Sequence, residues 1–177
     1  MAKKHHLPIL GATSDGQAVT ISEAELGYLT QLAGWENFEK AGDDALRAQG
    51  LSLPTDFRLP VRRGLTTVWR IAPDRVLVRS DTSLSFDSSP DLAVLDLSEA
   101  RICLTLEGPG VAGLLSRVIA LDFSEVAFPI GTFAQTALHH VGVLVERGER
   151  DIFTVMMPTT WATSLTSLLA DHLAKAA

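Results

Sequence analysis

The sequence contains few side chains whose type and spacing could support chemistry. Its five histidines include two adjacent pairs, His5-His6 and His139-His140, and its one cysteine is Cys103. Zinc sites use three or four Cys, His or carboxylate ligands held together by characteristic spacings. Neither a Cys-x-x-Cys nor a His-x-x-x-His pattern occurs in the chain. The sequence therefore does not indicate a zinc site, and His5-His6 is interpreted as part of a solvated tail.

The pair His139-His140 falls in a segment predicted to be a strand. Adjacent side chains on a strand point to opposite faces, so these two cannot bind one ion together. One is expected to face the covered side of the sheet and the other to face solvent or a partner. His140 carries an imidazole, the side chain most often used as a general base, but no nucleophile or orienting acid can be assigned to it. A structural role is favoured, and Gln135 with Thr136 is expected to satisfy local hydrogen bonds.

Two further features have ordinary structural interpretations. Cys103 lies in the middle of an apolar strand pattern, which predicts a buried or partner-facing thiol. Gly108-Pro109-Gly110 lies between a strand and a helix, as a dinucleotide-binding fingerprint would, but it lacks the third glycine, and Pro109 has no N–H to donate. A tight strand-to-helix turn is predicted there. The sequence thus predicts no catalytic, metal-binding or cofactor-binding residue.

The composition is that of a folded protein with an acidic balance. Hydrophobic residues make up 46% of the 177 residues, the net charge is −6, and the mean hydropathy is +0.20. Lys and Arg are concentrated only around Arg62-Arg63, too few for a nucleic-acid surface. No apolar run has the length of a signal peptide or a membrane helix, and a single cysteine permits no internal disulfide. A cytoplasmic protein is expected, with either a large core or an apolar surface covered by a partner.

The first third of the chain is predicted to be an irregular arm followed by helices. Residues 1–20 show no periodicity. Ser22 and Glu25 have the spacing of a capping box, and apolar residues follow at helical spacing as far as Ala33. A second helix is predicted over 35–49 and a linker over 51–60. The expected division is therefore 1–60, arm and helices, and 61–177, an α+β domain, together one compact unit.

The remainder alternates strands with two helices. Strands are predicted over 65–71, 76–80, 92–97, 101–107, 132–138, 140–146 and 151–157. Val111, Leu114, Leu115 and Val118 predict a helix packed on a sheet. A final helix is expected to begin at Thr159 or Thr160. Because hairpins supply most strand pairs, the fold class is α+β, a largely antiparallel sheet with helices packed on one face.

Several segments from residue 64 onward carry a family resemblance. They are Val68–Asp74 with its following strand, Asp96-Leu97-Ser98, Leu106–Pro109, Leu121–Phe123, Phe128–Gly131, Ala134–Thr136 and Met157-Pro158 with Trp161. In their order and spacing they resemble the gamma subunit of heterotetrameric sarcosine oxidase, over about two-thirds of the chain. The resemblance implies a fold related to the folate-binding domain of aminomethyltransferases.

The resemblance also implies a function. Complexes of that family oxidatively demethylate an N-methyl amino acid, as in the conversion of sarcosine to glycine. Their larger subunits hold FAD, FMN and NAD, a small subunit holds zinc, tetrahydrofolate is implied for the partners, and the gamma chain holds no cofactor. The segment 81–91 is shorter than in the family, so a gamma-like subunit of N-methylglutamate dehydrogenase is an alternative. A free-standing folate-binding protein of the same fold is another.

Five residues are predicted to have an interface or structural role. Aromatic side chains dominate protein interfaces, so the three aromatic residues among the five are candidate interface anchors, with core packing as the alternative. The polar members belong to the strand and histidine pair described above. The five are Trp69, Phe128, Gln135, His140 and Trp161.

Overall fold

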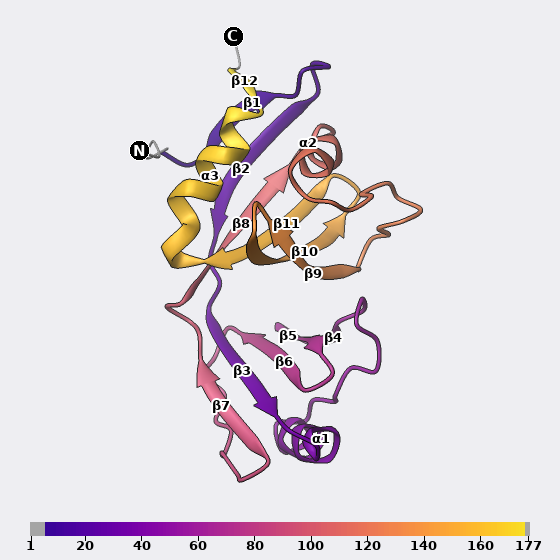
Figure 1. Cartoon of the computed structure of the whole chain (residues 1–177), viewed down its shortest axis with the longest axis vertical. Coiled ribbons are helices and arrows are strands. Elements are labelled where there is room, and N and C mark those ends of the chain that lie inside the picture. The colour runs from indigo at the N-terminus through magenta and orange to yellow at the C-terminus, as the bar shows by residue number, and fades with distance from the viewer. Residues whose placement is uncertain (1–5, 176–177) are drawn as a thin grey trace. The chain divides into compact units, whose positions relative to one another are not determined.

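The computed structural model describes residues 6–175, which form two compact units. The first unit contains the residues up to Glu25 together with those from Ala100 onward, and the second contains Leu26–Glu99. The second unit is therefore inserted into the first along the chain, and each has its own antiparallel sheet (Figure 1). This division differs from the boundary at residue 60 expected from the sequence. The α+β class is confirmed.

The first unit is built on a seven-stranded sheet with the order β12-β1-β2-β8-β11-β10-β9, in which all neighbours are antiparallel. Its helical elements are α2 (Val111–Val118), the 3-10 turn η1 (Thr159–Trp161) and α3 (Ala162–Asp171). Its strands are β1 (Ile9–Ala12), β2 (Ala18–Ala24), β8 (Arg101–Glu107), β9 (Phe133–Leu138), β10 (Val141–Glu149), β11 (Ile152–Pro158) and β12 (Ala174–Lys175).

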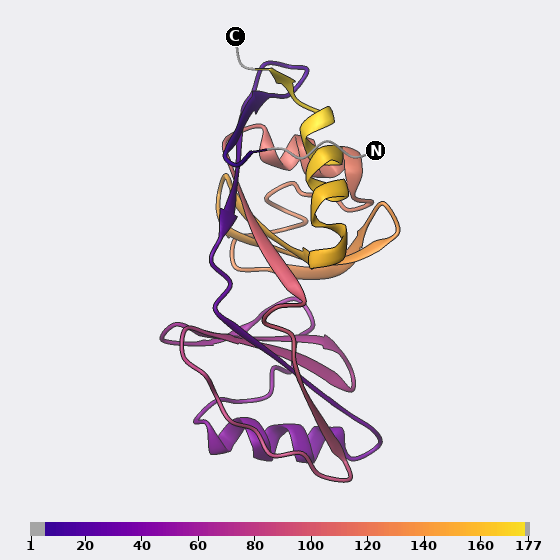
Figure 2. The ribbon, with the colours of Figure 1, turned by 90° about the vertical axis from the view of Figure 1, so that its left-hand side faces the viewer.

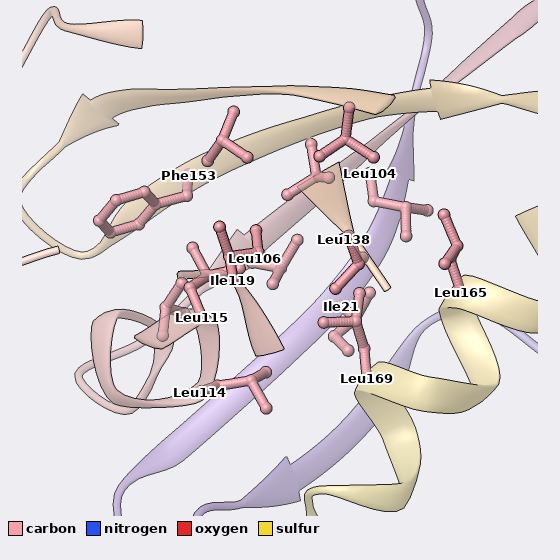
Figure 3. Packing of buried hydrophobic residues seen from close by; sticks show 14 of the residues in the cluster. Ile21, Leu104, Leu106, Leu114, Leu115, Ile119, Leu138, Phe153, Leu165 and Leu169 are labelled. Carbon is pink, nitrogen blue, oxygen red and sulfur yellow. The ribbon is translucent and has the colours of Figure 1, made fainter. Parts of the chain in front are cut away.

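The two helices of this unit contribute to one core on one face of the sheet. Val111, Leu114 and Leu115 of α2 are fully buried, as their spacing predicted. Leu165 and Leu169 of α3 join the same cluster (Figure 3). Alternate strand residues complete the core, among them Ile21, Leu104, Leu106, Val143, Val145 and Val155.

The second unit has a five-stranded sheet with the order β4-β5-β6-β3-β7 and one helix, α1 (Phe38–Ala48). Phe38 and Leu46 of α1 pack on Leu32, Val68 and Val76 of the sheet, and Figure 2 shows the helix lying along that sheet. None of the helices in residues 6–175 has the length and apolar character needed to span a bilayer. The strands are β3 (Tyr28–Gly34), β4 (Val61–Arg63), β5 (Thr66–Ala72), β6 (Arg75–Ser80) and β7 (Leu92–Asp96).

The predicted arm and first helix are wrong, because residues 9–12, 18–24 and 28–34 are strands. In β2, buried Val19 and Ile21 alternate with polar residues, which is a strand period. In β3, Leu29 and Leu32 lie on opposite faces, yet both are fully buried. Burial on both faces of one strand gives a three-residue spacing that imitates a helix.

Most other elements are confirmed. The second predicted helix exists with shorter bounds, as α1, and the strands and helices predicted from residue 65 onward all occur within a few residues of the expected positions. The final helix begins with η1, and no side-chain cap bond is formed at its start. The short strands β4 and β12 were not predicted.

Gly108-Pro109-Gly110 is the tight turn predicted between β8 and α2. Gly108 has a φ of +122°, and a Cβ atom there would lie 2.4 Å from the carbonyl oxygen of Ala18. A Cβ atom on Gly110 would lie 2.7 Å from the carbonyl oxygen of Gln17. The glycines are therefore needed for the close approach of the segment before β2, and they do not form a phosphate loop.

Replacing Gly108 by Ala is expected to lower the free energy of unfolding by about 2–3 kcal/mol, through positive-φ strain and the clash with Ala18. The matched control is Gly113→Ala on α2, where a Cβ atom meets open space. That change is expected to stabilise the protein by ~0.5–1 kcal/mol, since Gly is a poor helix former. Urea denaturation of both variants measures the difference, and equal effects would contradict the close-approach argument.

Candidate functional site

The described residues contain no cluster that could hold a metal ion. Across 6–175, no group of three or more His, Cys, Asp or Glu side chains comes together. Cys103 is buried in β8, as predicted. His6 is described, whereas its neighbour His5 lies outside the described residues.

His139 and His140 do not occupy a strand, so the prediction that they point to opposite faces of a sheet is wrong. They form the two-residue turn between β9 and β10, with φ of 46° and 72°, as a type I′ hairpin requires. Both side chains are exposed, and their ring centroids are 5.2 Å apart. Leu138 pairs directly with Val141, so the two residues between them must form the turn and cannot continue the strand.

The five predicted interface or structural residues have different environments. Phe128 is 3% exposed and belongs to the core of the first unit, and Trp69 is buried on β5. Trp161 is 47% exposed in η1. Gln135 on β9 and His140 in the following turn are exposed. Three of the five are thus accessible to a partner, and Phe128 packs inside.

A cavity of about 610 Å³ lies in the second unit, between α1 and residues 85–92. Asn37 donates to Asp91 Oδ1 over 3.2 Å, and Gln49 donates to the carbonyl oxygen of Ser85 over 2.7 Å, so hydrogen bonds link the helix to the loop near each end of the helix. The charged side chains around it are Lys40, Asp44, Asp87 and Asp91. They are not arranged as an acid, a base and a nucleophile, so we assign no reaction to this groove.

The most developed surface feature is the long loop between α2 and β9 in the first unit. The loop folds over three aromatic rings, Phe123, Phe128 and Phe153. Ring centroids are 5.1 Å apart for Phe123 and Phe128, and 5.8 Å apart for Phe123 and Phe153, which meet edge to face. Such pairs add about 0.5–1.5 kcal/mol each beyond the buried area. The loop therefore has a core of its own.

The side chain of Arg147, on β10, binds main-chain carbonyl oxygens of this loop. Arg147 is 3% exposed, and its guanidinium carbon lies 4.9 Å from the Phe153 ring centroid. Nη1 donates to the carbonyl oxygens of Phe128, over 2.9 Å, and Phe123, over 3.3 Å. Nε donates to the carbonyl oxygen of Arg150 over 3.0 Å. One buried cation thus connects the loop to the β10–β11 hairpin.

The loop is also closed by local hydrogen bonds. The backbone N–H of Ser124 donates to Asp122 Oδ1 over 2.8 Å, and this bond holds the pKa of the Asp122 carboxyl below its usual value. Phe128 N–H donates to the Ser124 carbonyl oxygen over 2.8 Å. At the rim, Glu125 and Arg150 form an exposed ion pair of 2.6 Å. The loop conformation is therefore specified by many contacts.

This well-bonded loop presents apolar side chains to solvent. Val126 is 93% exposed and Ile130 is 57% exposed. No Asp, Glu, Lys or Arg occurs from residue 126 to residue 145. Exposed apolar side chains are typical of the centre of a protein interface, and the neighbouring charge of Glu125 is already paired with Arg150. We use the name uncharged surface for the loop residues Val126 and Ile130 together with β9 and the turn that follows it. Sequence reasoning missed Val126 and Ile130, and the available signal was the number of apolar side chains in a connecting loop.

Replacing Arg147 by Met is expected to lower the free energy of unfolding by about 3 kcal/mol or more, because several buried carbonyls lose a charged donor. Arg150→Met is the control, since that side chain is 76% exposed and exposed ion pairs contribute only ~0–1 kcal/mol. Urea denaturation gives both values. If Arg147→Met were as mild as Arg150→Met, Arg147 would not organise the loop.

Replacing His140 by Gly is expected to raise the free energy of unfolding by up to about 1 kcal/mol, because Gly adopts the positive φ of a type I′ turn without strain. His140→Ala keeps the strain and is expected to give no gain. Thermal unfolding of the two variants makes the comparison, and a stabilised Ala variant with an unchanged Gly variant would refute the turn assignment.

Comparison with known proteins adds evidence on the fold. No family model matches the chain, and no curated protein matches it. Among solved structures, the chain is similar to a chain of heterotetrameric sarcosine oxidase from Corynebacterium sp. U-96, solved in complex with pyrrole 2-carboxylate. The TM-score is 0.76, the sequence identity is 22%, and the match covers 96% of this chain and 91% of that one.

A second similar structure is the glycine cleavage system aminomethyltransferase T from Bartonella henselae. Its TM-score is 0.55 and its identity 16%, over 84% of this chain and 44% of that chain. At these identities the similarity establishes the fold. The chain therefore has the α+β fold of the sarcosine oxidase and aminomethyltransferase structures, as its sequence segments predicted.

Proposed function

We propose that this chain is a non-catalytic small subunit, of the gamma type, in a heterotetrameric complex of the sarcosine oxidase type. The observation that carries the proposal is the extent of the structural match. It covers nearly all of both chains, so the similar chain has about the same size and belongs to an assembly described as heterotetrameric. A whole-chain match of this kind favours an equivalent subunit over a shared domain within a larger enzyme.

The residues that carry the family resemblance support a structural role. Arg70, in the segment Val68–Asp74, is 7% exposed and donates to the carbonyl oxygen of Pro73 over 2.8 Å and to Glu39 Oε2 over 2.5 Å. Its position joins a strand, the following turn and α1. In this segment, which carries part of the family resemblance, Arg70 thus connects elements of the fold, as expected for a subunit with a structural role.

The motif Asp96-Leu97-Ser98 has a similar local role. The Ser98 hydroxyl donates to Asp96 Oδ1 over 2.6 Å and accepts from the Leu29 N–H over 3.0 Å. The bond from Ser98 lowers the pKa of the Asp96 carboxyl. The motif thus ties the end of β7 to the start of β3, and it contributes to assembly only by shaping the unit.

In the proposed complex the chemistry resides in other chains. Large subunits would hold FAD, FMN and NAD, a small subunit would hold zinc, and tetrahydrofolate would receive the one-carbon unit. The reaction would be oxidative demethylation of an N-methyl amino acid, sarcosine to glycine, in the cytoplasm. The exposed apolar residues of this chain, Val126 and Ile130 in particular, provide surface for such partners.

Two alternatives rest on specific observations. The segment 81–91 is shorter than the resemblance implies, so a gamma-like subunit of N-methylglutamate dehydrogenase, which would have a similar four-subunit composition, is one alternative. The similarity to an aminomethyltransferase favours a free-standing folate-binding protein of the same fold. Co-purification of partner subunits separates the two complexes from the free-standing protein, and the substrate that the purified complex oxidises separates the two complexes from each other.

When the chain is expressed with an affinity tag in its native host, we expect it to co-purify with large flavin-containing subunits and a small zinc-containing subunit. Mass spectrometry identifies the chains, and visible absorbance measures the flavin. Oxidation of sarcosine or of N-methylglutamate by the purified complex then decides between the two oxidoreductases. A chain that elutes alone as a monomer would refute the complex, and titration with tetrahydrofolate would test the remaining alternative.

A further inference from the structure

Strand β9 is a free edge of the seven-stranded sheet. It pairs with β10 on one side and ends the strand order on the other, within the described residues. Gln135 and Ala137 are exposed and Thr136 is partly exposed, and no described strand of the first unit's sheet other than β10 pairs with this stretch. An edge of this kind presents main-chain donors and acceptors to any extended segment that approaches it.

The hairpin geometry identifies the outward-facing groups. Leu138 and Val141 flank a two-residue turn and form its closing hydrogen-bonded pair. Hydrogen-bonded pairs alternate along an antiparallel ladder, so Thr136 and Ala134 also bond to β10. The N–H and C=O groups of Gln135 and Ala137 therefore point away from the sheet, as do those of Phe133 at the start of the strand.

The other sheet edges among the described residues are protected by shortness or charge. β12 has two residues, and β4 has three, including Arg62 and Arg63. β7 ends in Asp96 and follows closely on Asp91. β9 has six residues, and it contains neither a charge nor a proline, two of the features that prevent an edge from pairing.

The apolar residues of the uncharged surface lie close to this edge along the chain. Ile130 precedes β9 by three residues, which span at most ~10 Å. Val126 and Ile130 sit on a loop already ordered by Arg147, so little conformational entropy would be lost when they are covered. An incoming strand would therefore find main-chain groups on β9 and apolar side chains just before it.

We propose that β9 accepts an extended strand from a larger partner subunit, added antiparallel or parallel to the edge, with Val126 and Ile130 covered by the same partner. This inference rests on the proposed function. A partner from a different chain is favoured because the structurally similar chain comes from a heterotetramer. The partner segment should lack charged side chains where it meets β9, because residues 126–145 offer no counter-charge.

Two variants of β9 test the inference in the tagged full-length chain. Gln135→Lys places a charge on the edge, and Ala137→Pro removes an outward N–H that β10 does not use. Each is expected to reduce the co-purified large subunit at least tenfold while the thermal midpoint of the isolated chain stays within a few degrees. Ser116→Lys, an exposed position on α2, is the matched charge control and is expected to capture the partner normally.

The outcomes distinguish this inference from the proposed function. If the wild-type chain captures the large subunits and both β9 variants capture as much, the edge inference is overturned and the proposed function stands. If the wild-type chain captures none, both are overturned. A homodimer of the purified chain that Gln135→Lys dissociates would assign the edge to a second copy and overturn the partner assignment. If Ala137→Pro unfolds, Gln135→Lys decides the question.

Discussion

The structure of the first unit depends on a buried positive charge that is held by main-chain carbonyls. Moving a guanidinium out of water is costly unless its donors are satisfied, and Arg147 meets this condition with oxygens from Phe123, Phe128 and Arg150. Those oxygens belong to a loop and a hairpin turn, which lie outside the regular hydrogen bonding of the strands. The need to satisfy one cation therefore joins the loop's own local hydrogen bonds in specifying the conformation of segments that the sheet leaves undetermined.

The second unit uses a similar but less complete solution, because the buried Nε of its arginine, Arg70, has no hydrogen-bond partner among the described residues. Arg70 is 7% exposed, lies 5.1 Å from the Phe57 ring centroid and donates to the carbonyl oxygens of Pro54 and Pro73. It also pairs with Glu39, whose side chain is 69% exposed, so this cation has one carboxylate near the surface. In both units, an arginine on a strand connects irregular segments. Surfaces built on such segments are preorganised, which reduces the entropy lost when a partner binds.

Sequence patterns correctly predicted elements that bury only one of their faces. The stripe Val111, Leu114 and Leu115 faces one core, and the helix α2 follows directly from it. The pattern failed where both faces of a strand are buried, as at Leu29 and Leu32, since two-sided burial removes the period of two. The interleaving of the units was also hidden, because it depends on pairing between distant segments such as β2 and β8. Such pairing leaves no local signal.

The uncharged surface around β9 was also beyond what local sequence patterns can predict. Gln135 and His140 were selected as interface residues from their polarity, and both are exposed, but polarity alone did not distinguish a strand from the turn that contains His140. What makes β9 available is its place at the end of the strand order, which is a property of the whole sheet. A sequence reports which side chains a strand carries. Only the topology reports which of its main-chain groups are unused, and for a chain whose proposed role is assembly those groups matter more than any single side chain.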